Sequence, residues 1–169
     1  MTRREITIFT DGACESNPGP GGWAATLTSG PHRKSISGGV RRTTNNRMEL
    51  QAVIEGLKAL KHGNQRVKIV TDSQYVSRSV TERWLEKWAA KGFKKNNGFR
   101  ENSDLWQELR ALLGRHTVQF QWIRGHAGHE ENEACDVLAV AARRQQNLPA
   151  DEGYEDPERV RSRLGLTLL

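Results

Sequence analysis

The chain has 169 residues, with 26 Lys and Arg against 20 Asp and Glu, so its formal net charge is +6. This length predicts one domain, and a membrane-spanning protein is excluded because the longest apolar run, 137–142, is far shorter than the roughly 20 residues that a membrane helix needs. Arg3 and Arg4 precede a strand pattern and not the apolar centre of a signal peptide, which excludes secretion and favours a cytoplasmic location.

Three strands are predicted at the start of the chain. The first is indicated by Ile6 and Ile8, which alternate with other residues up to a turn at Thr10-Asp11-Gly12. The other two are expected at 23–27 and 34–40, which have similar patterns. The Asn-Pro-Gly-Pro-Gly-Gly segment at 17–22 is expected to be a loop, since it fits neither a helix nor a central strand. The connections are short, which favours antiparallel pairing.

A helix is predicted next, from Asn45 to Gly63, because apolar residues recur there at helical spacing. Asn46 and Glu49 have the separation of a capping box at its N-terminus. The patterns that follow predict a strand at 67–71, short helices at 74–80 and 83–91, and a loop at 91–102.

Residues 102–144 predict a helix capped near Asn102 or Ser103, then a strand at 118–122 and a helix at 130–144. The apolar face of the final helix is expected to run through Ala134, Leu138, Ala141 and Ala142. The order of elements predicts an α/β fold. Its mixed five-stranded sheet, with three antiparallel N-terminal strands and two further strands, is flanked by helices.

Two of the predicted strands end in the same way, at Thr10-Asp11-Gly12 and at Thr71-Asp72-Ser73. Ligand sites in open α/β sheets lie just beyond the carboxyl ends of strands, and carboxylates there can hold Mg²⁺. The alternative is that each aspartate only begins a turn. Glu49 has a similar pair of interpretations, as a third ligand or as the capping-box glutamate.

Asp136 and Asn132 lie four residues apart on the last predicted helix, so their side chains face the same way. Asp136 is flanked by Cys135 and Val137, and it is either a surface residue or a functional one. His126 lies in a glycine-flanked loop, where it is either a surface histidine or a group that moves protons near neutral pH.

The positive charge favours an anionic partner, of which nucleic acid is the commonest, although many proteins without one are mildly basic. Residues 83–101 hold six Lys or Arg against two Glu, interleaved with Trp84, Trp88, Phe93 and Phe99. This composition is typical of a surface that follows a nucleic-acid backbone. The alternative is a solvated helix whose tryptophans pack inward, and we expect some rings in the core and the lysines outside it.

Six segments together resemble the bacterial type 1 ribonuclease H family (ribonuclease HI). They occur in the family's order across 5–145: Phe-Thr-Asp-Gly-Ala-Cys (9–14), Asn-Pro-Gly-Pro-Gly-Gly-Trp (17–23), Thr-Thr-Asn-Asn-Arg-Met-Glu-Leu (43–50), Thr-Asp-Ser-Gln-Tyr-Val (71–76), Asp-Leu-Trp (104–106) and Gly-His-Ala-Gly-His-Glu-Glu-Asn-Glu (125–133) followed by Cys-Asp (135–136).

The resemblance implies hydrolysis of the RNA strand of an RNA–DNA hybrid by a monomeric enzyme, leaving 3′-hydroxyl and 5′-phosphate ends. By the same resemblance, His126 helps proton transfer or product release and Asn132 orients it or a nearby carboxylate. Two divalent ions, normally Mg²⁺ or Mn²⁺, are expected on four carboxylates: Asp11, Glu49, Asp72 and Asp136.

The resemblance also assigns substrate contacts. Residues expected to line the minor groove are Cys14, Asn17, Asn45, Asn46 and Gln74, and those expected to hold a DNA-strand phosphate are Arg42, Thr44 and Asn102. The family's basic protrusion corresponds to 84–100, where the contacts are Trp84, Lys87, Lys94 and Lys95. Glu101 stands where a lysine is common, so we expect weaker binding there.

The resemblance ends near residue 145, so we predict a catalytic domain at 1–145 and a C-terminal tail of unknown role at 146–169. One alternative is an integrase or junction resolvase, which lacks the Asn-Asn-Arg-Met-Glu and Gly-His-Ala-Gly-His segments. A second is a non-catalytic hybrid-binding module of the same fold. The presence of all four carboxylates favours the active nuclease.

Overall fold

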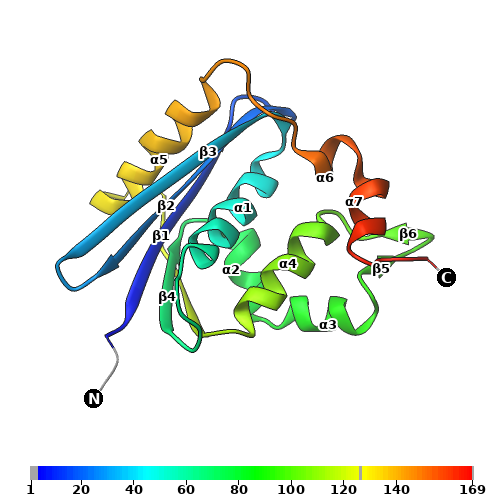
Figure 1. Ribbon diagram of the computed structural model, residues 1–169, viewed down its shortest axis with the longest axis horizontal. Coiled ribbons are helices and arrows are strands. Elements are labelled where there is room, and N and C mark those ends of the chain that lie inside the picture. Colours follow the sequence, from blue (N-terminus) through cyan, green and yellow to red (C-terminus); the bar gives the residue numbers. More distant parts are fainter. Residues whose placement is uncertain (1–3, 126, 169) are drawn as a thin grey trace.

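A five-stranded sheet forms the centre of the computed structural model, which describes residues 4–125 and 127–168. Its strands are β1 (Ile6–Cys14), β2 (Gly19–Ser29), β3 (His32–Thr43), β4 (Arg66–Thr71) and β7 (Thr117–Trp122). The strand order is β3-β2-β1-β4-β7; the first three strands pair antiparallel, and β4 runs parallel to β1 and β7 (Figure 1). The predicted mixed sheet is therefore confirmed.

Helices cover both faces of this sheet (Figure 1). On one face lie α1 (Asn45–Lys58), α2 (Gln74–Thr81), α3 (Trp84–Ala90) and α4 (Ser103–Leu113), and on the other lies α5 (Glu130–Arg143). The larger apolar core fills the space between the sheet and the first group, with Ile8, Leu50, Ile69 and Trp106 fully buried. Burial of these large side chains is the main stabilising contribution to the fold.

The contact between α5 and the sheet depends on small residues. Gly22 of β2 lies so close to the carbonyl oxygen of Ala139 that a Cβ atom at this position would collide with it. The predicted face of α5 was only partly right, because it counted apolar residues while the buried side includes a polar one. Of the predicted residues, Ala142 is buried, Ala134 and Leu138 are half-buried, and Ala141 is exposed. The buried residues of the helix are Asn132, Cys135, Ala139 and Ala142.

The prediction that 17–22 is a loop was wrong in its second half. β2 begins at Gly19 and lies between β1 and β3, so Gly19 to Gly22 belong to a central strand. The register with β3 shifts between Gly19 and Gly21, which places Pro20 at an irregularity. A bulge accommodates a proline within a sheet, because the missing N–H is not needed for the regular ladder there.

The ends of α1 also differ from the prediction. Thr44 is the N-cap, and its hydroxyl accepts a hydrogen bond from the Arg47 backbone N–H at 3.3 Å, so Asn46 and Glu49 do not form a capping box. The helix ends at Lys58, before Gly63. Farther along, the loop expected at 91–102 contains a short hairpin, made of β5 (Lys94–Lys95) and β6 (Gly98–Phe99).

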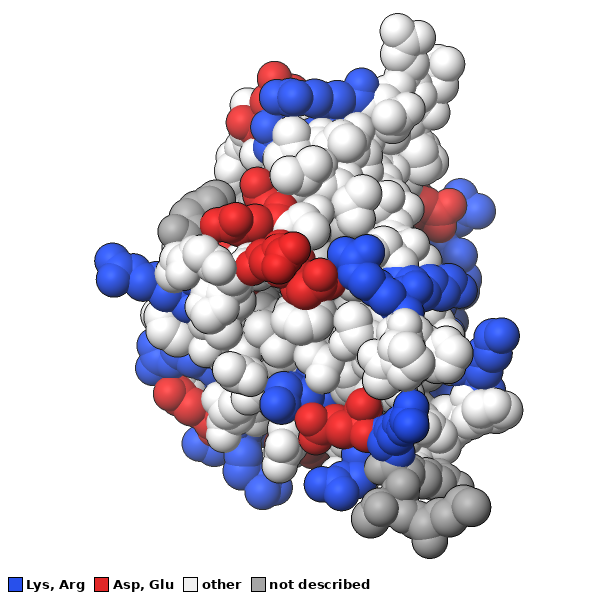
Figure 2. All heavy atoms as spheres, turned by 90° about the vertical axis from the view of Figure 1, so that its left-hand side faces the viewer, with Lys and Arg blue, Asp and Glu red and all other residues white. Residues whose placement is uncertain are grey.

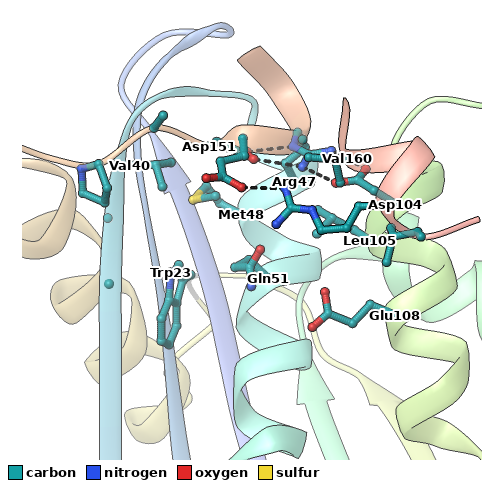
Figure 3. A pocket seen from close by; sticks show the side chains of 18 residues that line it. Trp23, Val40, Arg47, Met48, Gln51, Asp104, Leu105, Glu108, Asp151 and Val160 are labelled. Carbon is teal, nitrogen blue, oxygen red and sulfur yellow. Dashed lines mark hydrogen bonds and ion pairs between the residues drawn. The ribbon is translucent and has the colours of Figure 1, made fainter. Parts of the chain in front are cut away.

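The C-terminal segment folds back onto α1 and α4 through α6 (Glu152–Glu155) and α7 (Pro157–Arg163). The Arg47 guanidinium binds Asp104 at 2.8 Å and Asp151, just before α6, at 2.7 Å (Figure 3). Beside this ion-pair network lies a cavity of about 520 Å³ between α1, α4 and the segment. Among the described residues, no helix is both long and apolar enough to cross a membrane.

Candidate active site

Three carboxylates converge at one edge of the sheet. Asp11 lies near the end of β1, Asp72 directly follows the neighbouring parallel strand β4, and Glu49 lies on α1 above them. Each offers an oxygen atom, and these atoms all lie within 4.8 Å of one another. Gly12 makes this possible, because a Cβ there would lie 2.5 Å from the Glu49 backbone nitrogen and would hold α1 away from β1.

The carboxylates raise one another's pKa. Burial, followed by repulsion from Asp72 and Asp136, raises the pKa of Asp11 to about 8. Burial and the charges of Asp11 and Asp72 raise the pKa of Glu49 well above its usual value. Three clustered carboxyl groups are therefore costly to ionise unless a cation neutralises them.

The donor set fits a hard divalent cation. All the converging atoms are carboxylate oxygens, which are the ligands that Mg²⁺ and Mn²⁺ prefer. Oε2 of Glu49 is buried and has no hydrogen-bond partner within the described part of the chain, so it is an acceptor available to a metal ion. Asp136 borders the group from α5, close enough to Asp11 to affect its pKa by charge and by a hydrogen bond.

Two residues that sequence reasoning missed hold Asp72 in place. The Trp122 indole N–H donates a hydrogen bond to the Asp72 carbonyl oxygen at 2.9 Å. A Cβ at Gly125 would lie 2.7 Å from Oδ2 of Asp72, so the carboxylate rests against this glycine. Gly125 lay within a recognised motif, but its contact with a residue 53 positions earlier has no local sequence signal.

The loop and helix next to these carboxylates carry the other predicted catalytic groups. His126 lies outside the described residues. Asn132 is 3% exposed, and its amide nitrogen has no hydrogen-bond partner in 4–125 and 127–168. Asn132 therefore carries a buried, unpaired donor on the helix that also carries Asp136.

Most of the predicted groove residues lie near the start of α1, and Gln74 lies at the start of α2. The Asn17 side-chain oxygen accepts a hydrogen bond from the Asn45 backbone N–H at 3.0 Å. The Cys14 thiol donates to the Ser16 carbonyl oxygen at 2.6 Å, and Gln74 is exposed at the first position of α2. A hollow of about 430 Å³ is lined by four of the predicted substrate contacts, which are Asn17, Thr44, Asn46 and Asn102.

The remaining predicted contacts are spread over the surface. Arg42 is exposed near the end of β3, and Lys87, Lys94 and Lys95 are exposed on α3 and β5. The aromatic rings pack against one another: Trp84 contacts Trp88 at 6.4 Å between ring centroids, and Trp88 contacts the buried Trp106 at 5.3 Å. As expected, rings supply packing while lysines remain exposed.

The face that carries α5 and β3 differs in charge from the surface of α3 and β5, which presents exposed lysines. Figure 2 shows acidic side chains in the middle of this face with basic side chains around them, and no continuous basic surface. The first turn of α5 contributes acidic residues here, namely Glu130, Glu131 and Glu133. The basic residues of α3 and β5 belong to other elements, on the side of the sheet opposite α5 (Figure 1).

A mixed five-stranded sheet with clustered carboxylates at the ends of neighbouring strands defines a protein of the ribonuclease H fold. The structure of LC9-RNase H1, described as a type 1 RNase H with the type 2 active-site motif, is similar with a TM-score of 0.77 and 35% identity, over 92% of this chain and 81% of that one. The sequence profile of the RNase H family matches residues 3–144, so the chain belongs to the ribonuclease H family.

One further relative agrees with this assignment, and one further structure shares the fold. A ribonuclease H from Rippkaea orientalis is 49% identical over 154 residues, which is 90% of this chain and 94% of that protein. LC11-RNase H1, solved in complex with an RNA/DNA hybrid, shares the fold with a TM-score of 0.61 and 23% identity, over 81% of this chain and 95% of that one. The predicted family is confirmed, and the chain is a ribonuclease H enzyme.

Proposed function

We propose that the chain is an endonuclease that hydrolyses the RNA strand of RNA–DNA hybrids with two divalent ions, normally Mg²⁺. The observation that carries this proposal is the set of carboxylate oxygens of Asp11, Glu49 and Asp72 within 4.8 Å of one another. When bound, the ions supply an activated water and stabilise the leaving 3′-oxygen, which yields 3′-hydroxyl and 5′-phosphate ends.

The protein's own residues hold the ions and the substrate. Asp11, Glu49, Asp72 and Asp136 hold the metal, and the raised pKa values of Asp11 and Glu49 mean that metal binding displaces protons from these groups. The polar residues around the start of α1 select RNA through its 2′-hydroxyls, which a wide minor groove exposes. They are Cys14, Asn17, Asn45, Asn46 and Gln74.

The DNA strand is held on two surfaces in this proposal. Thr44 and Asn102, which line one hollow, bind a phosphate together with Arg42. The exposed lysines at 87, 94 and 95, together with the half-buried Trp84, track the backbone farther along. We also propose that 1–145 is the catalytic domain, that 146–169 is an added tail, and that the enzyme acts as a cytoplasmic monomer.

The direct test is cleavage of one labelled RNA strand that is paired with DNA, paired with RNA, or left single, with and without Mg²⁺. Cleavage of the hybrid alone, and only with the metal, is expected. A protein that binds the hybrid but cleaves nothing under any of these conditions would instead be the non-catalytic module. Cleavage of double-stranded RNA at the same rate would contradict the proposed selection of the hybrid.

His126→Ala is expected to slow turnover by roughly 10²- to 10⁴-fold without eliminating it, since general acid–base assistance contributes about that much. The measurement is kcat on the hybrid, with His129→Ala as a matched control. His129 is the N-cap of α5 but makes no side-chain capping hydrogen bond. Equal losses in the two variants would show that position 126 has no special role.

Gly125→Ala is expected to lower kcat by roughly 10- to 100-fold, because the added Cβ displaces the Asp72 carboxylate that rests against this position. Gly114→Ala is the matched control, since its Cβ meets its nearest neighbour at an ordinary 3.5 Å. The control keeps full activity. Unchanged kcat in Gly125→Ala would mean that Asp72 tolerates this displacement or does not bind metal.

A further inference from the structure

The C-terminal segment at 146–169 carries five acidic and three basic residues, yet its acids are largely used in internal contacts. Asp151 is bound to Arg47, Glu155 accepts hydrogen bonds from Arg41 at 2.9 Å, and Glu152 pairs with Arg163 at 2.9 Å. Asp156 caps α7 by accepting from the Arg159 backbone N–H. Asp151 and Glu155 are therefore bound to arginines of the rest of the protein, whereas Glu152 is paired within the segment.

Arg161 on α7 is different. Within the described residues it forms no ion pair, whereas Arg163 on the same helix is paired with Glu152. Its guanidinium carbon lies 4.8 Å above the centroid of the Phe99 ring in β6, so a cation–π contact connects α7 to the hairpin (Figure 1). Such a contact orients a guanidinium while leaving its charge and its N–H donors available.

Residues of α7 form part of the wall of the hollow of about 430 Å³ beside α1. Arg161, Tyr154 and Pro157 line it together with Thr44 and Asn102, the two residues proposed to bind a DNA-strand phosphate there. Arg100 lines it as well, held 4.5 Å above the Trp88 ring, and its buried Nε has no hydrogen-bond partner in the described structure.

The lining thus offers two arginines that are positioned by aromatic rings and lack carboxylate partners among the described residues. Glu101, at the same hollow, contributes a negative charge, and Asp104 is already bound to Arg47. A site of hydroxyl, amide and guanidinium donors is suited to the oxygens of a phosphodiester, which Arg can bind through two parallel hydrogen bonds.

We propose that Arg161, supplied by the C-terminal segment, binds a backbone phosphate of the DNA strand in this hollow. The inference rests on the proposed function, because it extends the phosphate contact assigned to Thr44 and Asn102. α7 then serves as a third part of the substrate surface, in addition to the start of α1 and the protrusion at 84–100. The net charge of the segment does not indicate this role, because the segment is acidic overall and only one of its arginines, Arg161, lines the hollow.

The test compares Arg161→Gln with Arg159→Gln, both made in an Asp72→Asn background that cannot cleave. Arg159 is the matched control, because it lies two residues away on the same helix and is exposed. Binding of a labelled hybrid is followed by fluorescence anisotropy over a series of KCl concentrations. Arg161→Gln is expected to weaken binding roughly three- to tenfold and to flatten the slope of log K against log[KCl] by about 0.7–0.9, the value of one phosphate contact.

Arg161→Lys distinguishes a loss of charge at this position from a disturbance of the fold. It keeps the cation and is expected to restore most of the salt slope, while Arg159→Gln keeps the parent's affinity and slope. Failure of Arg161→Lys to restore the slope would show that the glutamine acts through the fold and would overturn the proposal. An unchanged slope in Arg161→Gln, or an equal loss in Arg159→Gln, would also overturn it.

The strand is identified with uncharged methylphosphonate linkages placed one at a time along the DNA strand. At one position, the substitution is expected to weaken the parent by a larger factor than Arg161→Gln, because the variant has already lost the contribution of Arg161 to that phosphate. If no DNA position behaves in this way, the assigned strand is wrong. Failure of the proposed function is seen separately, as absence of hybrid cleavage by the unmodified chain.

Discussion

Asp11→Asn abolishes measurable cleavage of the hybrid and at the same time raises the melting temperature of the metal-free protein by several degrees. Both effects have one cause. Asp11 is 5% exposed and lies between other carboxylates, so its charge is useful only when a cation is bound. Asparagine keeps the shape of the side chain but removes the charge that holds the metal and repels Asp72 and Asp136.

The pH dependence follows from the direction of the pKa shift. Burial and neighbouring carboxylates raise the folded-state pKa of Asp11 from 3.8 to about 8. A raised pKa stabilises the fold below the unfolded-state value, and this stability is lost as the pH rises through about 8. The gain in melting temperature from Asp11→Asn is therefore small near pH 4 and largest above pH 8.

Calorimetry in EDTA between pH 4 and pH 9 measures this difference. Mg²⁺ is expected to raise the melting temperature of the parent more than that of Asp11→Asn, because the variant has lost a ligand. Glu5→Gln is the control: it removes a carboxylate at the opposite end of β1, where Glu5 is 3.7 Å from Lys68. Cleavage at the parental rate by Asp11→Asn, or a fall in its metal-free stability, would contradict the assignment of this residue.

The carboxylate cluster could be predicted from sequence because its main signal is local and repeated. Two strands ending in Thr-Asp place Asp11 and Asp72 at the same edge once the strands are parallel neighbours, as β1 and β4 are. Glu49 was ambiguous, since a glutamate near a helix start also caps helices. Only the packing of α1 against β1, which Gly12 permits, shows that its side chain faces the other carboxylates.

The errors arose where tertiary packing overrides local preference. Gly19 to Gly22 have the composition of a loop, but glycine in β2 is what lets α5 lie close to the sheet. The face of α5 was partly misassigned because the buried Asn132 looks like a surface residue in an apolar count. Both errors concern the same interface between α5 and β2, where Gly22 contacts Ala139, more than 100 positions away in the chain.

The ion pair between the C-terminal segment and α1 had no sequence signal. Asp151 lies 104 residues from Arg47 and appeared as one of several acids in a polar stretch. In the structure it shares a buried guanidinium with Asp104, and the Thr43 hydroxyl donates a further hydrogen bond to it at 2.7 Å. The segment is thus fastened to the first turn of α1, where Arg47 lies two positions before Glu49 on the same helix.

Arg47→Met is expected to lower the free energy of unfolding by about 3–5 kcal/mol, the usual cost of removing one partner from a buried ion pair. The Arg47 side chain is 4% exposed and binds both Asp104 and Asp151 (Figure 3). Methionine has a similar length but leaves two buried carboxylates facing each other without a cation. Urea denaturation followed by circular dichroism measures the change.

Arg41→Met is the matched control, because Arg41 also binds an acid of the same segment, Glu155, in a two-pronged geometry, but its side chain is 61% exposed. Exposed pairs are screened by water, so this variant is expected to unfold at the parental urea concentration. Adding Asp104→Asn and Asp151→Asn to Arg47→Met should recover much of the loss, since no unpaired charge then remains buried. Equal effects of Arg41→Met and Arg47→Met would mean that attachment of the segment, and not burial of the charge, determines the stability.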